Sequence, residues 1–492
     1  MVDSQIKIPS RVSIDGHLGT IRYHGLIPAW DKPAFGVEWD DACRGKHSGI
    51  YDGKQYFKCH VESSATFIKS SRKSDLQVSF LQALNSKYAP KYEHEIEKKN
   101  VVFGTKVVER VGFDKFRRLL TQLDKLTFVS LQNERVKYAS DNLAEVCPRL
   151  QDLDLSQNLF ESVNEVAKIV AQLPKLTSLT LNGNRFLDWE LDDELKDSFA
   201  NITMISLSAT LIPHQVLLQL GKLFPNAKVC NLAANLLSES NLAFKTAWHV
   251  ESLDLSFNNF STIPHIRQCP SLDRLNLSHN SIPVVSGLLE WTAAGRITSI
   301  DLRYNLISAW SSVDMLVSAF TTTKEARLRW NPLFAEMNED EAHVLTIARW
   351  GSLQSLNGTK ISDRERTNAE IYFMNKVVLD NGSKLDFDPT CQRWIELCEK
   401  YGTPEAPVPV PKRSKFINVG FVVNDVKKNR NLPRGLTVEK LKNLVGKWYK
   451  VAVSDITLDL IDDGQRRRLA DNIREIEFYG VDDGLTIDVG ID

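Results

Sequence analysis

Apolar residues recur in one short pattern through the middle of the chain, from about Leu126 to Leu356. Each copy spaces its residues as L-x-x-L-x-L-x-x-N. The last position recurs every 22 to 26 residues, at Asn158, Asn184, Thr210, Asn235, Asn258, Asn280, Asn305 and Asn331. A period of this length, with one short alternating segment in each copy, predicts stacked repeats that share a continuous core.

The pattern assigns different roles to the apolar and polar positions of each copy. The apolar residues of L-x-L alternate across a short strand and point into the stacked core. The asparagine amide can bond turn backbone that no strand pairing satisfies, so the asparagines are predicted to be structural rather than ligand-binding. The pattern resembles the leucine-rich repeat, and this resemblance implies a solenoid with a concave sheet.

The solvent-facing x positions of the repeats are polar and partly acidic. Because solenoids use their concave surface for recognition, we expect it to bind a protein rather than a small molecule. An ordinary solvated face would have the same composition. The candidate contact residues are Asp154, Thr180, Asp254, Asp301 and Arg329.

From Arg11 to about Lys73 the chain consists of short apolar runs separated by glycines, which predicts a small β domain with tight turns. Four segments follow one another there: Gly19-Thr-Ile-Arg-Tyr, Phe35-Gly-Val-Glu-Trp-Asp, Gly45-Lys-His-Ser-Gly and Gly53-Lys-Gln-Tyr-Phe-Lys-Cys. Together they resemble the CAP-Gly domain. The resemblance implies a glycine-rich groove that binds acidic carboxy-terminal tails ending in an aromatic residue, above all the tail of α-tubulin.

The charge of this segment agrees with that implication. Between residues 43 and 73 there are seven Lys or Arg and two acids, and a basic patch beside aromatic residues suits an acidic peptide. A solubilising basic edge would show the same surplus. By the family match, Lys46 and His47 would contact the peptide, while Gly45 and Gly49 would let the backbone approach closely. The candidate tail contacts are Phe35, Trp39, Gly45, Lys46, His47, Ser48, Gly49 and Phe57.

Connectors and caps separate the modules. The polar and charged stretch 79–100 predicts a connector that is helical in part, and 114–126 predicts an amphipathic helix that caps the solenoid. After the last repeat, Ser362 and Glu365 have the spacing of a capping box. Four prolines between 403 and 411 predict an extended spacer.

The carboxy-terminal part has the order of a small α/β domain: an apolar strand at 416–423, a polar turn, an amphipathic helix at 437–449, and strands at 456–461 and 486–489. This order resembles the ubiquitin-like β-grasp fold. The predicted fold class is therefore multidomain, with a small β CAP-Gly domain, an α/β leucine-rich-repeat solenoid and a ubiquitin-like β-grasp domain. The predicted boundaries are 1–78 for the CAP-Gly domain, 79–100 for a linker, 101–400 for the capped solenoid, 401–413 for the proline-rich linker and 414–492 for the ubiquitin-like domain.

Composition narrows the class of function. The formal net charge of −1 gives no global field for nucleic acid, and no run of 18 apolar residues predicts a membrane span. The start of the chain has no apolar signal region, and its seven cysteines lie far apart with no C-x-x-C. We expect a cytoplasmic protein with reduced thiols, no metal, no cofactor, and neither nucleic acid nor membrane as a partner.

Common catalytic and nucleotide-binding motifs do not occur in the sequence. There is no G-x-x-x-x-G-K-[ST], no H-E-x-x-H, no G-x-S-x-G and no dinucleotide fingerprint. The ten histidines are scattered, and carboxylates occur throughout the chain. We therefore expect no catalytic residues and no enzyme activity.

The order CAP-Gly, leucine-rich repeats, ubiquitin-like domain covers nearly the whole chain and resembles the tubulin-folding cofactor E family. Gly45-Lys-His, Phe103-Gly-Thr-Lys and Val111-Gly-Phe-Asp-Lys extend the resemblance beyond domain order. It implies a chaperone of the cytoplasm and cytoskeleton that binds α-tubulin, joins the other tubulin-folding cofactors (B, C and D), and helps assemble or dissociate the αβ-tubulin heterodimer. Two alternatives remain open: a microtubule-binding adaptor, and a ubiquitin-pathway adaptor for tubulin turnover.

Overall fold

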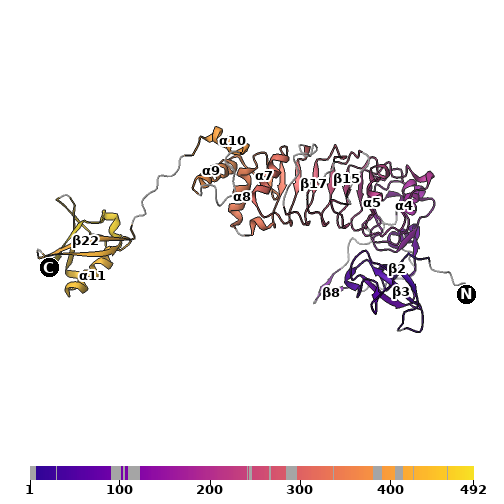
Figure 1. Ribbon diagram of the computed structural model, residues 1–492, viewed down its shortest axis with the longest axis horizontal. Coiled ribbons are helices and arrows are strands. Elements are labelled where there is room, and N and C mark those ends of the chain that lie inside the picture. Colours follow the sequence, from indigo (N-terminus) through magenta and orange to yellow (C-terminus); the bar gives the residue numbers. More distant parts are fainter. Residues whose placement is uncertain are drawn as a thin grey trace. The chain divides into compact units, whose positions relative to one another are not determined.

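The computed structural model describes the chain except residues 1–6, 29, 90–100, 104–105, 109–121, 241, 243–246, 265–266, 284–295, 336, 380–390, 405–413, 425, 463 and 492. Two compact units are present, residues 1–405 and 406–492 (Figure 1). The first unit contains a small β module and the repeat solenoid, and the second is an α/β domain. The predicted multidomain fold class is confirmed.

The solenoid is built on one sheet to which each repeat contributes a short strand (Figure 1). Its parallel strands are β10 (Phe128–Ser130), β12 (Asp152–Asp154), β13 (Ser178–Thr180), β14 (Met204–Ser206), β15 (Val229–Asn231), β16 (Ser252–Asp254), β17 (Arg274–Asn276), β18 (Ser299–Asp301), β19 (Glu325–Arg327) and β20 (Ser355–Leu356). β21 (Thr359–Lys360) pairs antiparallel with β20 and ends the sheet. Middle residues such as Leu153, Leu179 and Ile205 lie in register and are buried, as the repeat pattern predicts.

Short helices and turns connect these strands and close the core. They are η2 (Leu123–Lys125), α3 (Leu143–Val146), α4 (Val163–Ala171), η3 (Asp193–Leu195), α5 (His214–Leu217), α6 (Leu220–Leu223), α7 (Trp310–Ala319), η6 (Pro332–Phe334) and α8 (Glu339–Arg349). Val166, Leu220 and Leu316 on these helices are fully buried in the same core as the strand residues. The solenoid therefore has one continuous apolar interior rather than separate cores.

The asparagine column lies inside this interior and joins consecutive repeats. Asn158 and Asn184 are both fully buried. The Nδ2 of Asn184 donates to the carbonyl of Leu155 in the preceding repeat and to that of Leu181 in its own, both at 2.9 Å. Its Oδ1 accepts the backbone N–H of Asn158 at 3.0 Å. Because every polar atom of the amide is used by backbone, these residues have the structural role that the sequence predicts.

The amino-terminal end of the solenoid differs from the sequence prediction. The stretch 79–100 is predicted as a connector that is helical in part. The helix there, α1 (Phe80–Tyr88), belongs to the solenoid, because it packs Phe80, Ala83 and Leu84 into the solenoid core. Ser79 and Gln82 form a capping box at its start. β7 (Val78–Ser79) pairs with β11 (Val136–Tyr138), and β8 (Val101–Phe103) pairs with β9 (Lys106–Val108). Most of the helix predicted at 114–126 lies outside the described residues.

Two helices close the other end of the solenoid. α9 (Asp363–Leu379) starts with the predicted capping box, in which Glu365 N–H donates to Ser362 Oγ at 3.2 Å and Ser362 N–H donates to the Glu365 carboxylate at 3.4 Å. α10 (Gln392–Tyr401) packs on α9. Between them lies the buried Glu370, whose carboxylate accepts hydrogen bonds from Arg393, Lys400 and Tyr401. This carboxylate is therefore fully paired and part of the cap.

The β module contains β1 (Ser10–Ile14), β2 (His17–Gly25), β3 (Ala34–Trp39) and β6 (Ala65–Lys69), paired in the order β1-β2-β3-β6. A short hairpin of β4 (Ile50–Tyr51) and β5 (Lys54–Gln55) and the turn η1 (Ala42–Arg44) lie between β3 and β6. The sheet has apolar clusters on both faces, one around Val37 and one around Phe67. Every residue of β3 is consequently buried.

The β module and the solenoid meet at Arg11 on β1, whose side chain is fully buried. Its guanidinium donates to both carboxylate oxygens of Asp40 within the module, at 2.6 and 2.5 Å. Its backbone N–H donates to Glu161 of the solenoid at 2.7 Å. Its Nη2 also lies 3.5 Å from the Asn158 carbonyl, so Arg11 contacts the first repeats through both its backbone and its side chain.

The carboxy-terminal unit is a five-stranded sheet in the order β23-β22-β26-β24-β25 with one main helix. Its elements are β22 (Phe416–Val423), β23 (Val426–Pro433), α11 (Val438–Tyr449), η7 (Val453–Asp455), β24 (Ile456–Asp462), β25 (Gln465–Arg468), η8 (Ile476–Tyr479) and β26 (Thr486–Ile491). β22 and β26 pair in parallel at the centre, and the apolar face of α11 covers the sheet. This is the predicted β-grasp arrangement. The predicted polar turn after β22 is a strand, β23, whose side chains are almost all exposed.

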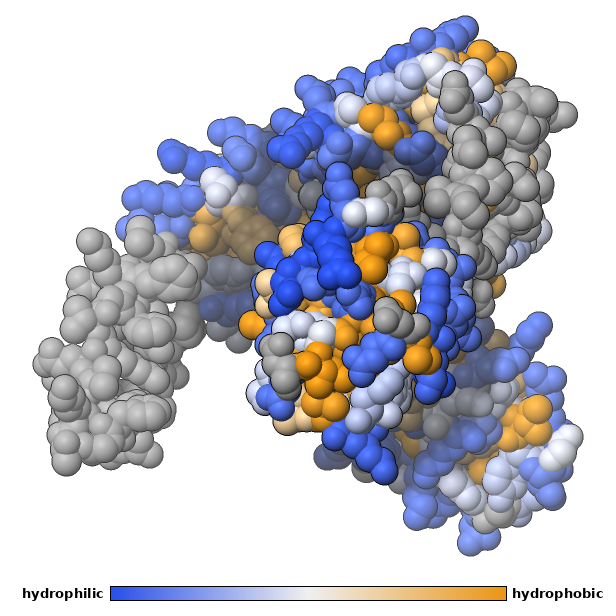
Figure 2. Space-filling view, turned by 90° about the vertical axis from the view of Figure 1, so that its left-hand side faces the viewer, coloured by the Kyte–Doolittle hydropathy of each residue, from blue (hydrophilic) through white to orange (hydrophobic). Residues whose placement is uncertain are grey.

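The surface of the protein carries little continuous apolar area on the face drawn in Figure 2, where apolar residues form small separate areas among hydrophilic ones. Among the described residues, no helix combines the length and the apolar character needed to cross a membrane.

Candidate functional site

The glycine-rich loop of the β module is tied by its backbone to the start of β6. The N–H groups of Lys46 and His47 both donate to the carbonyl of Ala65, at 2.7 and 3.2 Å, and the Ala65 N–H donates to the His47 carbonyl at 2.9 Å. A side chain at Gly45 would lie 1.9 Å from the carbonyl oxygen of Ser63. The loop therefore needs glycine to approach the neighbouring backbone this closely.

The loop lies beside a cluster of aromatic rings centred on Phe67 of β6. The Phe67 ring centroid is 4.8 Å from that of His47, 5.6 Å from Tyr56, 5.7 Å from Phe57 and 6.0 Å from Tyr51. Phe57 and Phe67 are buried beneath, whereas the rings of His47, Tyr51 and Tyr56 are half-buried and reach the surface. Residues 45–49 with Tyr51, Tyr56 and Phe67 are called the loop surface.

Phe57 reaches this cluster because β3 has a glycine opposite it. A Cβ atom at Gly36 would lie 2.2 Å from the Phe57 ring. The backbone carbonyl of Phe57 in turn lies where a side chain at Gly49 would project, at 2.1 Å. Phe57 therefore links the loop to β3, and both contacts depend on the missing side chains.

The two other predicted aromatic contacts, Phe35 and Trp39, do not reach the loop surface. Each is only 5% exposed, and both pack with Val12, Ile14 and Val37 in the apolar cluster on the other side of the sheet. The prediction that they contact a bound tail is corrected by this burial. Sequence reasoning missed Tyr51, Tyr56 and Phe67, and it also missed Tyr23, whose ring packs 5.3 Å from that of Tyr56.

The electrostatics of the loop surface favour a negatively charged ligand. Lys46 is exposed, and the ammonium of Lys54 lies 5.2 Å from the centre of the Tyr56 ring. Burial lowers the pKa of His47, so its ring is neutral near pH 7. His47 Nδ1 accepts the Gly49 N–H at 3.0 Å, which leaves Nε2–H as a donor. Ser48 instead has a local role, since its Oγ accepts the Ser63 N–H at 2.9 Å.

A buried carboxylate, that of Glu38, holds the segment between the loop surface and β6. Glu38 on β3 accepts the His60 N–H at 2.6 Å and the Arg22 Nε–H at 2.7 Å. Burial alone would raise the pKa of Glu38, but the hydrogen bonds from His60 and the charge of Arg22 outweigh burial and lower the pKa to about 2. Glu38 is therefore ionised at neutral pH and fixes the segment that leads into β6.

The predicted contact residues on the repeat face differ in whether their side chains are already bound to neighbouring residues. Asp154 accepts the Ser130 hydroxyl at 2.9 Å, and Asp254 accepts the Asn276 amide at 3.0 Å. Asp301 is only 8% exposed and is bound by Arg303, with Nη2 at 2.7 Å from Oδ2. These three carboxylates belong to short networks along the sheet.

Arg329 is exposed and forms an ion pair with Glu339 at 2.7 Å, and Thr180 is half-buried on β13. Sequence reasoning missed Met204 and Val229, two exposed apolar residues that are partners in register on β14 and β15. Their position on the solvent side of the sheet was available from the repeat pattern.

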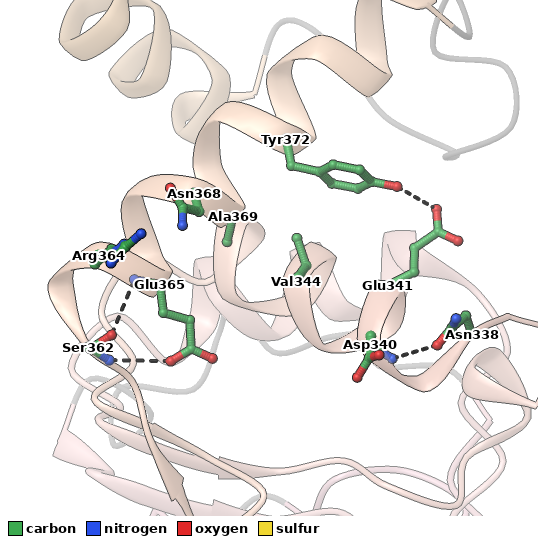
Figure 3. A pocket seen from close by; sticks show the side chains of 10 residues that line it. All are labelled: Asn338, Asp340, Glu341, Val344, Ser362, Arg364, Glu365, Asn368, Ala369 and Tyr372. Atoms are coloured by element: carbon green, nitrogen blue, oxygen red, sulfur yellow. Dashed lines mark hydrogen bonds between the residues drawn. The ribbon is translucent and has the colours of Figure 1, made fainter. Parts of the chain in front are cut away.

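A cleft of about 720 Å³ lies between α8 and α9. In Figure 3 three pairs of residues on its wall are joined by hydrogen bonds: Tyr372 donates to Glu341, the Asp340 N–H donates to the Asn338 side chain, and Ser362 and Glu365 form the helix cap. Among the described residues, no group of three or more His, Cys, Asp or Glu is placed to hold a metal. Two of these pairs cap the first turns of α8 and α9, and the Tyr372–Glu341 bond joins the two helices.

Comparison with known proteins covers the same two regions. A family model of the CAP-Gly domain matches residues 8–73, and a model of the Leucine Rich Repeat matches residues 249–269. Tubulin-specific chaperone E of Homo sapiens is 31% identical over 519 aligned residues, which cover 97% of this chain and 97% of that protein. This chain belongs to the tubulin-specific chaperone E family.

Two further comparisons concern relatives and structures that carry the same name. The Xenopus laevis tubulin-specific chaperone E is 29% identical and covers 96% of each chain. The solution structure of the C-terminal ubiquitin-like domain of mouse tubulin-specific chaperone e covers 17% of this chain and 95% of its own, at 21% identity and a TM-score of 0.16. The CAP-Gly match contains the loop surface, and the repeat match contains Asp254.

Proposed function

We propose that this protein is a tubulin chaperone. It binds α-tubulin, with the acidic tail on the loop surface and the body of the subunit on the repeat face. With the other tubulin-folding cofactors B, C and D, it assembles or dissociates the αβ-tubulin heterodimer. The observation that carries this proposal is the chemistry of the loop surface in a chain that matches tubulin-specific chaperone E over 97% of its length.

The loop surface has the three features that an acidic tail with a terminal aromatic residue needs. Lys46 supplies an exposed positive charge, His47 a neutral N–H donor, and the rings of Tyr51 and Tyr56 an apolar wall. Charged groups steer and orient such a ligand, and a buried aromatic side chain provides most of the affinity. We expect the tail to lie across residues 45–49 with its last ring against Tyr51 or Tyr56.

The contact through Arg11 supports a two-site mode of binding. Because the β module is held against the first repeats, a tail bound on the loop surface keeps the rest of the subunit near the repeat face. A second weak contact then acts at high effective concentration, and overall affinity exceeds that of either site. The repeat face offers the Met204–Val229 pair and Arg329 for this second contact.

The carboxy-terminal domain is proposed to contact another member of the assembly. Both edge strands of its sheet are basic, with Lys427, Lys428 and Arg430 on β23 and Arg466 to Arg468 on β25. Charged edges also prevent edge-to-edge aggregation, which gives these residues a structural reason. As a binding surface they favour an acidic partner.

Replacing Lys46 with alanine tests the tail site. Titration of the full chain with a fluorescent acidic peptide ending in tyrosine should show affinity weakened by roughly tenfold, because one charge-assisted contact is lost. Lys175→Ala, which removes an exposed lysine of the solenoid, should leave the affinity unchanged. The same peptide without its terminal aromatic should bind weakly to every variant. Equal affinity of wild type and Lys46→Ala would exclude the loop surface as the tail site.

A further inference from the structure

One position of the repeat, which recurs as a column along the solenoid, changes from small or polar residues to aromatic ones halfway along the array of repeats. The residue before each position of the asparagine column has a left-handed backbone, with φ between 53° and 69° in every repeat from Gln157 to Trp330. The column reads Gln157, Gly183, Ala209, Ala234, Phe257, His279, Tyr304 and Trp330. Four repeats thus have a small or polar residue there, and the next four have an aromatic ring.

The four rings stack on one another along the solenoid. The centroids of Phe257 and His279 are 4.0 Å apart, those of His279 and Tyr304 4.1 Å, and those of Tyr304 and Trp330 4.5 Å, with interplanar angles of 17° or less. Phe257 and Trp330 are each more than half exposed, and Tyr304 is 40% exposed. His279, between Phe257 and Tyr304, is half-buried, and these four residues are called the aromatic ladder.

The fold of the repeat does not require rings at these positions. Gly183, Ala209 and Ala234 occupy the same place with the same backbone conformation, so a small residue is sufficient. Bulky residues are disfavoured in the left-handed region, and such residues cluster at functional sites. Stacking compensates part of this local cost but leaves large apolar side chains in water. The ladder therefore indicates a binding surface.

The surroundings of the ladder define the chemistry of its partner. On the concave side each of the last two rings is preceded by an arginine, Arg303 or Arg329, which pair with Asp301 and Glu339 respectively. On the other side the residues two positions further on are uncharged: Asn259, Ser281, Leu306 and Pro332. An apolar centre of Tyr, Trp and Phe with an arginine rim is the composition of protein-interface cores. It complements an apolar protein surface with a polar rim.

The ladder ends at a cleft that can accept a side chain from that surface. The cleft has a volume of about 1090 Å³ and lies between the last repeats and α8. Leu306, Trp330 and Phe334 form its apolar wall, and Leu306 is 49% exposed. Glu339 also lines the cleft and pairs with Arg329. The apolar surface of the aromatic ladder thus extends into this cleft.

We infer that the aromatic ladder binds the apolar surface that an α-tubulin subunit buries against its partner in the heterodimer. This inference rests on the proposed function. A chaperone that holds a single subunit must cover the surface left exposed when the heterodimer is absent, and interfaces between permanent partners are more apolar than other protein surfaces. The ladder would then compete with the partner subunit for the same surface, which gives dissociation a physical basis.

The test replaces the two rings at the carboxy-terminal end of the ladder, in the variant Tyr304→Gly with Trp330→Gly. Glycine is favoured by the left-handed backbone, so folding should be retained and is checked by circular dichroism. Pull-down of α-tubulin by the full chain, after incubation with αβ-tubulin, should fall at least tenfold. Affinity for the acidic tail peptide should be unchanged, because the loop surface is intact.

Two matched controls accompany the double variant. Gln157→Gly makes the same change in the same column of an early repeat, and Tyr372→Ser removes an exposed tyrosine of α9 outside the ladder. Both should capture α-tubulin as the wild type does. Should the glycine variant unfold, Tyr304→Asn with Trp330→Asn replaces it, since asparagine also tolerates this backbone.

Retention of α-tubulin by the ladder variant would overturn the inference while leaving the proposed function in place. A wild-type chain that binds the tail peptide but captures no α-tubulin subunit would overturn both. Equal losses in the ladder variant and in Gln157→Gly would assign the effect to the column as a structural element and also overturn the inference.

Discussion

Gly49→Ala should unfold or displace the glycine-rich loop, whereas Gly53→Ala should cost little. Both glycines have a left-handed backbone, with φ of +86° and +74°. A Cβ atom at Gly49 would lie 2.1 Å from the carbonyl oxygen of Phe57, but at Gly53 it would meet nothing within 4 Å. The backbone penalty of about 1 kcal/mol is common to both variants, and only Gly49→Ala adds a backbone clash, for a total of roughly 4 kcal/mol.

Hydrogen exchange in the full chain measures this difference where it arises. Peptides from residues 8–73 should lose protection in Gly49→Ala and keep it in Gly53→Ala, while the solenoid is unaffected in both. Binding of the tail peptide should fall further in Gly49→Ala than in Lys46→Ala, because the whole loop surface is displaced. Similar protection in the two glycine variants would show that the loop does not depend on the close approach to Phe57.

Asn258→Ala should strongly destabilise the solenoid. The Asn258 amide donates to the carbonyls of Leu232, Leu255 and Ser256 at 2.9 to 3.1 Å, and its Oδ1 accepts the N–H groups of Asn235 and Leu237, both at 2.9 Å. Alanine leaves these buried backbone groups without partners, which should cost about 3 to 5 kcal/mol. Urea unfolding of the full chain, followed by circular dichroism, should show the main transition at lower urea.

Asn258→Thr is the matched comparison. Thr210 occupies the same column naturally, and its hydroxyl donates to the Leu207 carbonyl at 2.9 Å. A threonine at 258 should therefore recover part of the loss. If Asn258→Ala and wild type unfold at the same urea concentration, the asparagine column is not what joins the repeats.

The repeat architecture could be predicted from sequence because each repeat has the same spacing of apolar residues and asparagine. Leu153, Leu179 and Ile205 share one position of that pattern and lie in register in the sheet. The structural need for glycine in the loop could also be predicted from sequence. Where a motif brings two backbone segments close together, there is no room for a side chain. Local chemistry and local geometry agree at these positions.

Contacts that depend on tertiary packing could not be predicted from the sequence pattern. Phe35 and Trp39 belong to a strand that is buried on both faces, so alternation could not say which side faces the loop. Phe67 had the appearance of an ordinary core residue, although its ring supports the loop surface. The arrangement emerges only when β3, β6 and the loop pack together.

Polar strands and distant residues were missed for related reasons. β23 and β25 are so highly charged that no apolar alternation marks them, because they lie at the edges of their sheet. The rings of Phe257 and His279 stand 22 residues apart in the sequence and stack at 4.0 Å only in the assembled solenoid. Residues of different repeats become neighbours only when the repeats stack.

Size-exclusion chromatography with light scattering most directly tests whether this protein is a tubulin chaperone. The full chain is mixed with αβ-tubulin, alone and with the other tubulin-folding cofactors, and the subunits in each peak are identified. We predict that the heterodimer peak falls and that a complex of the chain with α-tubulin appears. An intact heterodimer peak, together with co-sedimentation of the chain with microtubules, would contradict the chaperone account and support a microtubule-binding adaptor.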